Sequence, residues 1–264
     1  MPFYTDTHAH IYLEEFEDEL PQLLQRAKDA LVYKILLPNI DSSATAALKR
    51  TADADYNIHP MMGLHPCYVK DNYEEELAHV LSELDSNYRS AHGRPYCAVG
   101  EIGIDLHWDV STLHIQIKAF KQQMRWAHER DLPVAVHCRN AYDEVIACIS
   151  EMGADRPKGV LHCFTGTMEQ AEALIDLGFL LGIGGVVTYK NSALADVVKA
   201  IDLRHIILET DSPYLPPVPY RGKRNEPAYT ILVAEKIAEL KGLGDPLLHV
   251  GQPTSMNATS LFRL

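Results

Sequence analysis

The sequence has too few basic residues for a protein that coats nucleic acid or an anionic membrane surface. Lys and Arg number 24 against 36 Asp and Glu, which gives a formal net charge of -12. This balance argues against a broad basic face. Any anionic substrate has to be held by a small number of local cations.

Long apolar runs and targeting signals are also missing. The longest apolar stretch, residues 178–187, covers ten residues and is interrupted by four glycines, whereas a membrane helix needs about 20 apolar residues. The first 20 residues contain no Lys or Arg and carry an acidic run at 14–19, unlike a signal or transit peptide. We therefore expect a cytoplasmic protein that does not contact membranes, and the sequence indicates no obligate protein partner.

Paired-cysteine motifs are absent, and so are nucleotide-binding motifs. The five cysteines show no CxxC spacing, which argues against a disulfide framework and a thiolate zinc site. Cys138 and Cys163 each follow a His, but neighbours on a strand point to opposite faces, which disfavours a Cys–His nucleophile pair. GIGGVV at 182–187 lacks the third glycine of a dinucleotide fingerprint, and the chain has no GKS/T phosphate loop.

The sequence does contain an eightfold alternation of strand and helix patterns. Short apolar, β-branched runs predict strands at 3–10, 32–38, 59–65, 96–104, 133–138, 159–163, 179–183 and 205–209. Amphipathic stretches predict helices at 14–30, 42–54, 73–90, 112–130, 140–152, 168–177, 192–200 and 228–241. This α/β order over 264 residues favours one (β/α)8 TIM barrel domain spanning 1–264 over a doubly wound open sheet.

Ionisable residues recur where the predicted strands end, which is where a barrel carries its active site. The predicted metal ligands at these ends are His8, His10, Glu101, His137, His162 and Asp211. Each alone is a weak signal, but four imidazoles and two carboxylates at one mouth would repel one another without a cation. Six ligands exceed one tetrahedral zinc site, so the pattern predicts two divalent ions that share a carboxylate and a bridging water.

Such a site is typical of hydrolysis by an activated water. Asp211 is the expected proton acceptor, and Glu209 lies one layer deeper on the same strand as its support. The loop at 213–227 follows the last strand and carries Arg221, Lys223 and Arg224. With Arg139, the arginines of this loop are candidates for phosphate binding, whereas Lys223 and Arg224 also fit a solvated charge run.

Seven motifs, in this order, resemble those of the TatD family of metal-dependent deoxyribonucleases. They are THAH at 7–10, GLHP at 63–66, GEIGID at 100–105, PVAVHCR at 133–139, HCF at 162–164, ETDSPYLPP at 209–217 and PYRGKRNEP at 219–227. The resemblance spans essentially the whole chain and extends to a closing helix around Asn257 and Phe262. It implies a barrel of the metal-dependent hydrolase type that binds two or three divalent ions and cleaves DNA phosphodiesters, commonly as a 3′ to 5′ exonuclease.

The resemblance also implies roles for single residues. Motif by motif, it places the six predicted ligands in the metal set, with Glu101 as the bridging and catalytic carboxylate. It further makes His65, Arg139, Arg221 and Asn225 contacts to substrate phosphate. The metal stays open among zinc, magnesium and manganese, because imidazoles suit zinc and manganese while DNA hydrolysis often uses magnesium.

Three functions therefore compete. The first is a nuclease acting on single-stranded or frayed DNA ends. The second is a hydrolase of the same fold acting on a small ester, lactone or phosphoester, favoured by the charge of -12 and by the lack of an aromatic-rich basic groove. The third, a non-catalytic binding module, is disfavoured because a complete ligand set with a proton acceptor has little purpose without chemistry.

Overall fold

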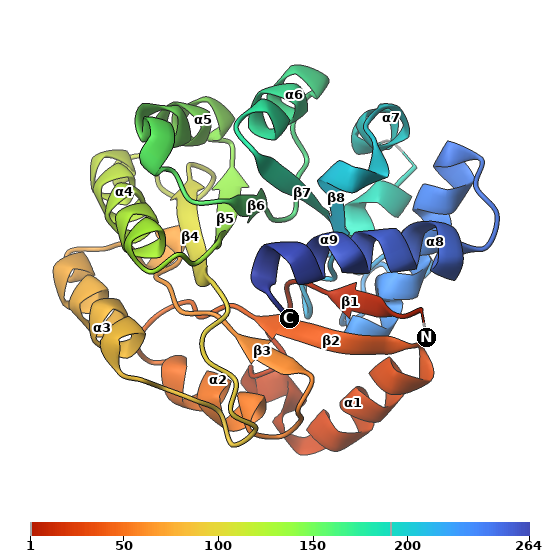
Figure 1. Cartoon of the computed structure of the whole chain (residues 1–264), viewed down its shortest axis with the longest axis horizontal. Coiled ribbons are helices and arrows are strands. Elements are labelled where there is room, and N and C mark those ends of the chain that lie inside the picture. The colour runs from red at the N-terminus through yellow and green to blue at the C-terminus, as the bar shows by residue number, and fades with distance from the viewer. Residues whose placement is uncertain (1, 191) are drawn as a thin grey trace.

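Short parallel strands form the inner wall of the molecule, and helices surround them (Figure 1). The computed structural model describes residues 2–190 and 192–264. Within these residues the strands are β1 (Tyr4–Asp6), β2 (Val32–Leu37), β3 (Ile58–Pro60), β4 (Val99–Asp105), β5 (Val134–Arg139), β6 (Gly159–Leu161), β7 (Phe179–Ile183) and β8 (Ile206–Leu208). Each matches a predicted strand, and the bounds of β7 agree with the prediction at both ends.

The strands form two parallel groups, β1 to β3 and β4 to β8, which backbone contacts join into a barrel. Parallel bridges pair Met62 with Val99 and Ala9 with Ser212. At the second junction the Thr7 N–H donates to the Leu208 carbonyl at 3.0 Å, and the Asp211 N–H donates to the His8 carbonyl at 2.8 Å. The predicted (β/α)8 barrel is confirmed.

The helices that follow the strands are α1 (Leu20–Asp29), α2 (Thr45–Ala52), α3 (Tyr73–Asp85), α4 (Leu113–Glu129), α5 (Tyr142–Glu151), α6 (Met168–Asp176), α7 (Leu194–Ala200) and α8 (Thr230–Lys241). Two predictions of helix extent were wrong. Residues Glu14–Glu19 form a 3₁₀-helix before α1. Helix α3 stops at Asp85 because the Ser86 hydroxyl bonds the Glu83 carbonyl in place of a further turn.

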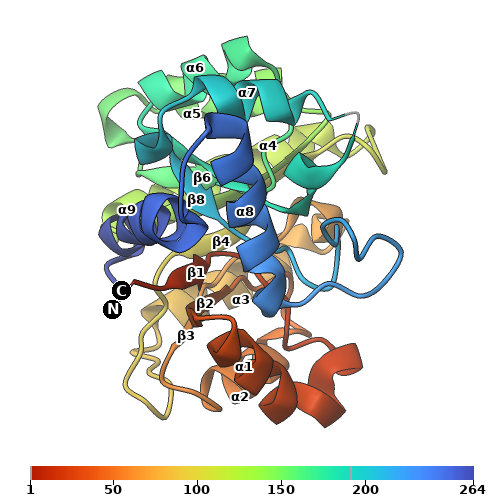
Figure 2. The same cartoon turned by 90° about the vertical axis from the view of Figure 1, so that its right-hand side faces the viewer.

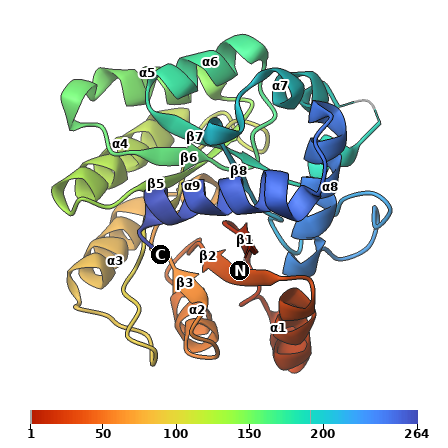
Figure 3. The same cartoon turned by 45° about the vertical axis from the view of Figure 1, so that its right-hand side comes forward.

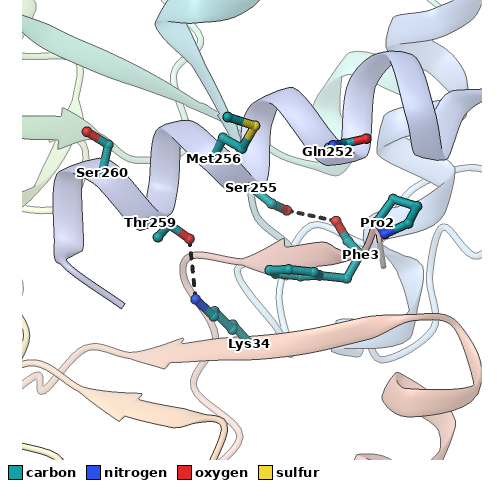
Figure 4. A pocket seen from close by; sticks show the side chains of 8 residues that line it. All are labelled: Pro2, Phe3, Lys34, Gln252, Ser255, Met256, Thr259 and Ser260. Carbon is teal, nitrogen blue, oxygen red and sulfur yellow. Dashed lines mark hydrogen bonds between the residues drawn. The ribbon is translucent and has the colours of Figure 1, made fainter.

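A further helix, α9 (Gln252–Phe262), lies across the end of the barrel where the strands begin (Figures 1 and 3). The Asn257 amide donates to the carbonyls of Leu203 and Ile206 at 2.8 and 2.9 Å. The Ser255 hydroxyl donates to the Phe3 carbonyl, and the Lys34 amine donates to the Thr259 hydroxyl (Figure 4). The predicted closing helix is therefore present. Figure 2 shows α9 at one end and the loop after β8 at the other.

Apolar residues fill the floor of the barrel next to α9. This floor consists of Leu36, Met61, Ala98, Ala135, Val160, Ile207, Ala258 and Phe262. Successive inward-facing residues of a strand are two positions apart. His137, His162 and Glu209 therefore stand one layer above Ala135, Val160 and Ile207. Among the described residues, no helix combines the length and apolar character that crossing a bilayer requires.

Gly182 in β7 allows this packing, because a Cβ there would lie 2.8 Å from Glu209 Cδ and 3.0 Å from His162 Cα. We predict that Gly182→Ala lowers the free energy of unfolding by about 1–3 kcal/mol through overpacking. Gly184→Ala is the matched control, since its Cβ would meet no atom closer than 3.5 Å. Urea unfolding of both variants measures the difference. Equal losses in the two variants would contradict the close packing around Gly182.

Candidate metal centre

His8 and His10 lie just after β1, where the chain continues beside β8. The His10 N–H donates to the Ser212 carbonyl at 2.7 Å, and this contact, with that from Asp211 to His8, fixes the backbone of both histidines. His8 is fully buried and His10 is 5% exposed. As the period of two predicts, the Nε2 atoms of both imidazoles lie close to the same two carboxylates, Glu101 and Asp211.

The first group of donor atoms has the spacing of ligands around one cation. Glu101 Oε2 lies 3.1 Å from His8 Nε2 and 3.5 Å from His10 Nε2. Asp211 Oδ1 lies 3.8 Å from His8 Nε2 and 3.5 Å from His10 Nε2. Ligand atoms bound at roughly 2.0–2.2 Å to one cation are about 3.0–3.5 Å apart. These four side chains can therefore hold a divalent ion.

A second group uses the other oxygen of Glu101. Glu101 Oε1 lies 2.9 Å from His137 Nδ1 and 2.8 Å from His162 Nε2. The two nitrogens are 3.2 Å apart. The structure thus brings all six predicted ligands together at one mouth, with Glu101 between two clusters of donor atoms.

The hydrogen bonds of His10 and His137 show that these imidazoles suit a metal ion. The Tyr12 hydroxyl donates its only hydrogen to the Pro38 carbonyl at 2.8 Å, so it accepts from His10 Nδ1 at 2.9 Å. Asp105 Oδ2 accepts from His137 Nε2 at 2.8 Å. A neutral imidazole carries one N–H, which leaves a lone pair on His10 Nε2 and on His137 Nδ1. Both lone pairs face carboxylate oxygens, and only a cation or a proton between them relieves the repulsion.

Burial and mutual charge shift the pKa values in this cluster. Burial alone would raise the pKa of Glu101, but the surrounding imidazoles outweigh it and hold that pKa well below its ordinary value. Burial lowers the pKa of His8 to about 4, so His8 is neutral at pH 7 and able to ligate a metal. Burial opposes protonation of His137, yet hydrogen bonds to Asp105 and Glu101 raise its pKa to about 9. Without a metal ion, a second proton on Nδ1 therefore separates His137 from Glu101 at neutral pH, and a bound cation would replace it.

Glu209 lies behind His162. Its Oε1 accepts from the Cys163 N–H and lies 3.8 Å from His162 Nδ1. Burial first, and then repulsion from Asp211, raises the pKa of Glu209 well above its ordinary value. Within residues 2–190 and 192–264 no hydrogen bond joins Glu209 to Asp211, so the geometry favours a role beneath His162 over the predicted support of Asp211.

The predicted substrate contacts fall into two sets. His65 and Arg139 line a cavity of about 600 Å³ that opens above the donor clusters. His65 Nδ1 accepts from the Cys67 N–H at 3.1 Å, which keeps its proton on Nε2, 3.3 Å from Glu101 Oε1. That nitrogen is therefore a donor, as the predicted contact to a phosphate oxygen requires.

Arg221 and Asn225 belong to the second set, because neither lines that cavity. The guanidinium carbon of Arg221 lies over the Tyr189 ring, 4.3 Å from the ring centre. Asn225 is fully buried, and its amide donates to the carbonyls of Thr210 and Tyr214 at 2.7 Å each. Its Oδ1 accepts from the Glu226 N–H. With these groups engaged, Asn225 holds the loop after β8, and the geometry does not support its predicted contact to substrate.

One other expectation from the sequence also changes. Arg224 bonds the Glu19 carboxylate and the Glu15 carbonyl, so its guanidinium is engaged within the protein and is not available for phosphate. Burial raises the pKa of Cys138 to about 12 and that of Cys163 well above its ordinary value. Neither thiol is a thiolate at neutral pH, which agrees with the rejection of a Cys–His nucleophile.

A family model described as TatD related DNase matches residues 5–263. The chain belongs to the TatD family. It is 40% identical to a Bacillus subtilis relative named as the uncharacterized metal-dependent hydrolase YabD, over 98% of each chain. The crystal structure of YjjV, a TatD homologue from Escherichia coli, superimposes with a TM-score of 0.90 at 30% identity and covers 99% of this chain and 98% of its own.

A third relative carries a more specific name. The 3'-5' ssDNA/RNA exonuclease TatD of Erwinia billingiae is 31% identical over 98% of each chain. Together, the family match and these full-length relatives show that the chain is a metal-dependent hydrolase of the TatD family.

Sequence reasoning gave no role to Tyr12 and Asp105, although both contact predicted ligands. For Asp105 the available signal was the strand period, since it stands four residues after Glu101 in β4, on the same face. Tyr12 lies in a turn two residues after His10, where the strand period does not apply. The sequence pattern does not show which atom each side chain bonds. Tyr12 bonds His10 in the same segment, whereas Asp105 bonds His137 in β5.

We predict that Asp105→Asn weakens divalent metal binding by about 10–100-fold. The loss of its charge loosens the His137 imidazole and reduces its basicity. The matched control is Asp109→Asn, which alters a partly exposed carboxylate on the same loop that bonds Ser111. Competition against a chromophoric chelator measures both affinities. Equal affinity in the two variants would refute the role of Asp105 beneath His137.

Proposed function

We propose that this TatD family member is a two-metal phosphodiesterase that degrades DNA from single-stranded or frayed ends in the 3′ to 5′ direction. The proposal rests on two groups of donor atoms, one near each carboxylate oxygen of Glu101. Both lie at the base of a cavity that Arg139 also lines. The name of the Erwinia relative as a 3'-5' ssDNA/RNA exonuclease supports the same class of substrate.

The proposed first ion is held by His8, His10, Asp211 and one oxygen of Glu101. The proposed second ion is held by His137, His162 and the other oxygen. Zinc, manganese and magnesium are the candidates, and the resemblance to the family allows a third ion. Divalent cations in such a site supply Lewis-acid chemistry, because they acidify water and offset charge on phosphate oxygens.

Asp211 is the proposed proton acceptor. Burial would raise its pKa, but the nearby His10 imidazole first, and then the charge of the other imidazoles, lower it, so the carboxylate is ionised at neutral pH. Asp211 has a φ of 58°, a left-handed conformation that non-glycine residues seldom adopt. The conformation turns the chain after β8 so that the carboxylate lines the cavity. There it is placed to take a proton from an attacking water.

Arg139 and His65 are the proposed phosphate contacts. The exposed Arg139 guanidinium offers several N–H donors, and His65 Nε2–H offers one beside Glu101. One strong cation at the cavity suits one phosphate group and contrasts with the extended basic track that long strands need. Because this acidic protein would hold phosphate only at the cavity, we propose that the ends of strands, and not internal stretches, are the substrate.

We predict that the metal-loaded protein shortens a labelled single-stranded oligonucleotide from its 3′ end and that EDTA abolishes the reaction. Asp211→Asn is expected to lower kcat by about 10²–10⁴-fold, because the proton acceptor is lost. Asp202→Asn, which alters an exposed carboxylate before β8, is the matched control and should leave kcat unchanged. Gel analysis of the products and metal content by mass spectrometry measure both.

The small-molecule alternative is tested in the same assay. A panel of carboxyl esters, lactones and phosphoesters is incubated under identical metal and chelator conditions. If oligonucleotides survive while one of these compounds is hydrolysed in a chelator-sensitive manner, the nuclease proposal fails. Digestion that starts from the 5′ end would retain the nuclease and reverse the proposed polarity.

A further inference from the structure

Trp108 is the most exposed aromatic side chain at the mouth of the barrel. Its side chain is 72% exposed, yet it also lines the cavity above the donor clusters. Burial of an indole is strongly favourable, so an exposed one beside a candidate active site points to a ligand that covers it. The inference below rests on the proposed nuclease function and names the part of the substrate that Trp108 contacts.

The backbone holds Trp108 in a fixed place relative to the proposed ligands. Asp105 Oδ1 accepts the N–H groups of His107 and Trp108 at 2.9 and 3.4 Å. The other oxygen of the same carboxylate accepts from His137. The His107 ring packs edge-on against the indole, with 4.7 Å between the ring centroids. One carboxylate therefore anchors both the His137 imidazole and the start of the loop that presents the indole.

Arg139 lies next to Trp108. Asp105 and Arg139 are partners in the pairing of β4 with β5, and the Arg139 guanidinium carbon is 5.6 Å from the centre of the indole. Among the residues that the structure describes, Arg139 forms no ion pair with a carboxylate. An uncompensated cation and an exposed aromatic face thus lie side by side, which matches the phosphate and the base of one nucleotide.

Two more aromatic side chains stand on the rim, by which we mean the residues around the opening of the cavity. Tyr68, after β3, is 41% exposed, and Tyr214, after β8, is 54% exposed; both line the cavity. The rim is therefore more aromatic than the sequence alone indicated. Val110 is 69% exposed on the same loop as Trp108 but does not line the cavity, which makes it a matched control.

We propose that Trp108 stacks on the base of the terminal nucleotide while Arg139 binds its phosphate, so that the substrate end must present an unpaired, unstacked base. Every base has a π face, so this contact is tolerant of sequence. A base within a duplex is covered by its neighbours and cannot offer that face without being extruded. Selection for single-stranded or frayed ends would then follow from the indole and not from a reading of base edges.

The first experiment measures base contact without hydrolysis. Deoxynucleoside 5′-monophosphates are titrated into the metal-loaded protein while tryptophan fluorescence is recorded, with deoxyribose 5-phosphate and inorganic phosphate as ligands that lack a base. The chain has two tryptophans, and Trp126 is 8% exposed, so Trp108 is the accessible reporter. We expect quenching by the nucleotides alone and its loss in Trp108→Phe, which leaves only the Trp126 signal.

The second experiment separates binding from chemistry. Trp108→Ala is expected to raise KM for single-stranded oligonucleotides by roughly ten-fold or more, the size of a lost base–aromatic stack, with kcat unchanged. Trp108→Phe should retain most of the affinity because it keeps an aromatic face. Val110→Ala should change neither constant. An oligonucleotide with an abasic 3′-terminal residue should show the higher KM in wild type and no further increase in Trp108→Ala.

The outcomes separate this inference from the proposed function. If oligonucleotides are cleaved but Trp108→Ala leaves KM unchanged, the nuclease stands and base stacking is refuted. If nucleotides and deoxyribose 5-phosphate quench equally, base stacking is likewise refuted. If wild type leaves all oligonucleotides intact, the proposed function fails, and the quenching titration still decides whether Trp108 contacts a base.

Discussion

A buried carboxylate surrounded by imidazoles is the constraint on which the mouth of the barrel depends. Glu101 is 2% exposed, and nitrogen atoms of five histidines lie within 3.5 Å of its oxygens. Such a charge is costly to bury unless positive charge compensates it. Because Tyr12 and Asp105 hold one proton of His10 and His137 on the far side of each ring, the ring nitrogen nearest the carboxylate repels it unless a second proton or a cation lies between them. Metal binding would relieve this repulsion, so it should also stabilise the fold.

The same constraint links the metal centre to the substrate side of the cavity. Asp105 uses one oxygen for His137 and the other for the N–H groups of His107 and Trp108. A shift of this carboxylate would therefore move a proposed ligand and the rim together. Gln116 of α4 bonds the Asp105 backbone on both sides, at 2.8 and 3.0 Å. The position of the rim is thus set by the packing of a helix against the barrel as well as by the loop itself.

The sequence was sufficient to predict elements that depend on local periodicity. The strands were predicted because β-branched runs alternate with amphipathic segments, and the six proposed ligands were predicted because polar residues follow strand ends. Contacts between segments distant in the chain were not predictable in this way. Arg224 bonds Glu19, which lies 205 positions earlier in the chain. The Asn225 amide donates to the backbone carbonyl of Thr210, which follows β8. A pattern shows that a side chain is polar, but not whether a neighbour already occupies its hydrogen-bonding groups.

The acidic surface and the proposed nucleic-acid substrate are compatible for an electrostatic reason. At physiological ionic strength, charges more than about 8 Å apart in solvent are largely screened, so the net charge of -12 mainly weakens contact with a long strand lying over the surface. A terminal nucleotide inside the cavity meets Arg139 and the proposed cations at short range, where attraction exceeds that repulsion. The acidic surface would then disfavour internal stretches while the cavity retains the end. On this view, the charge of the protein contributes to selection for chain ends.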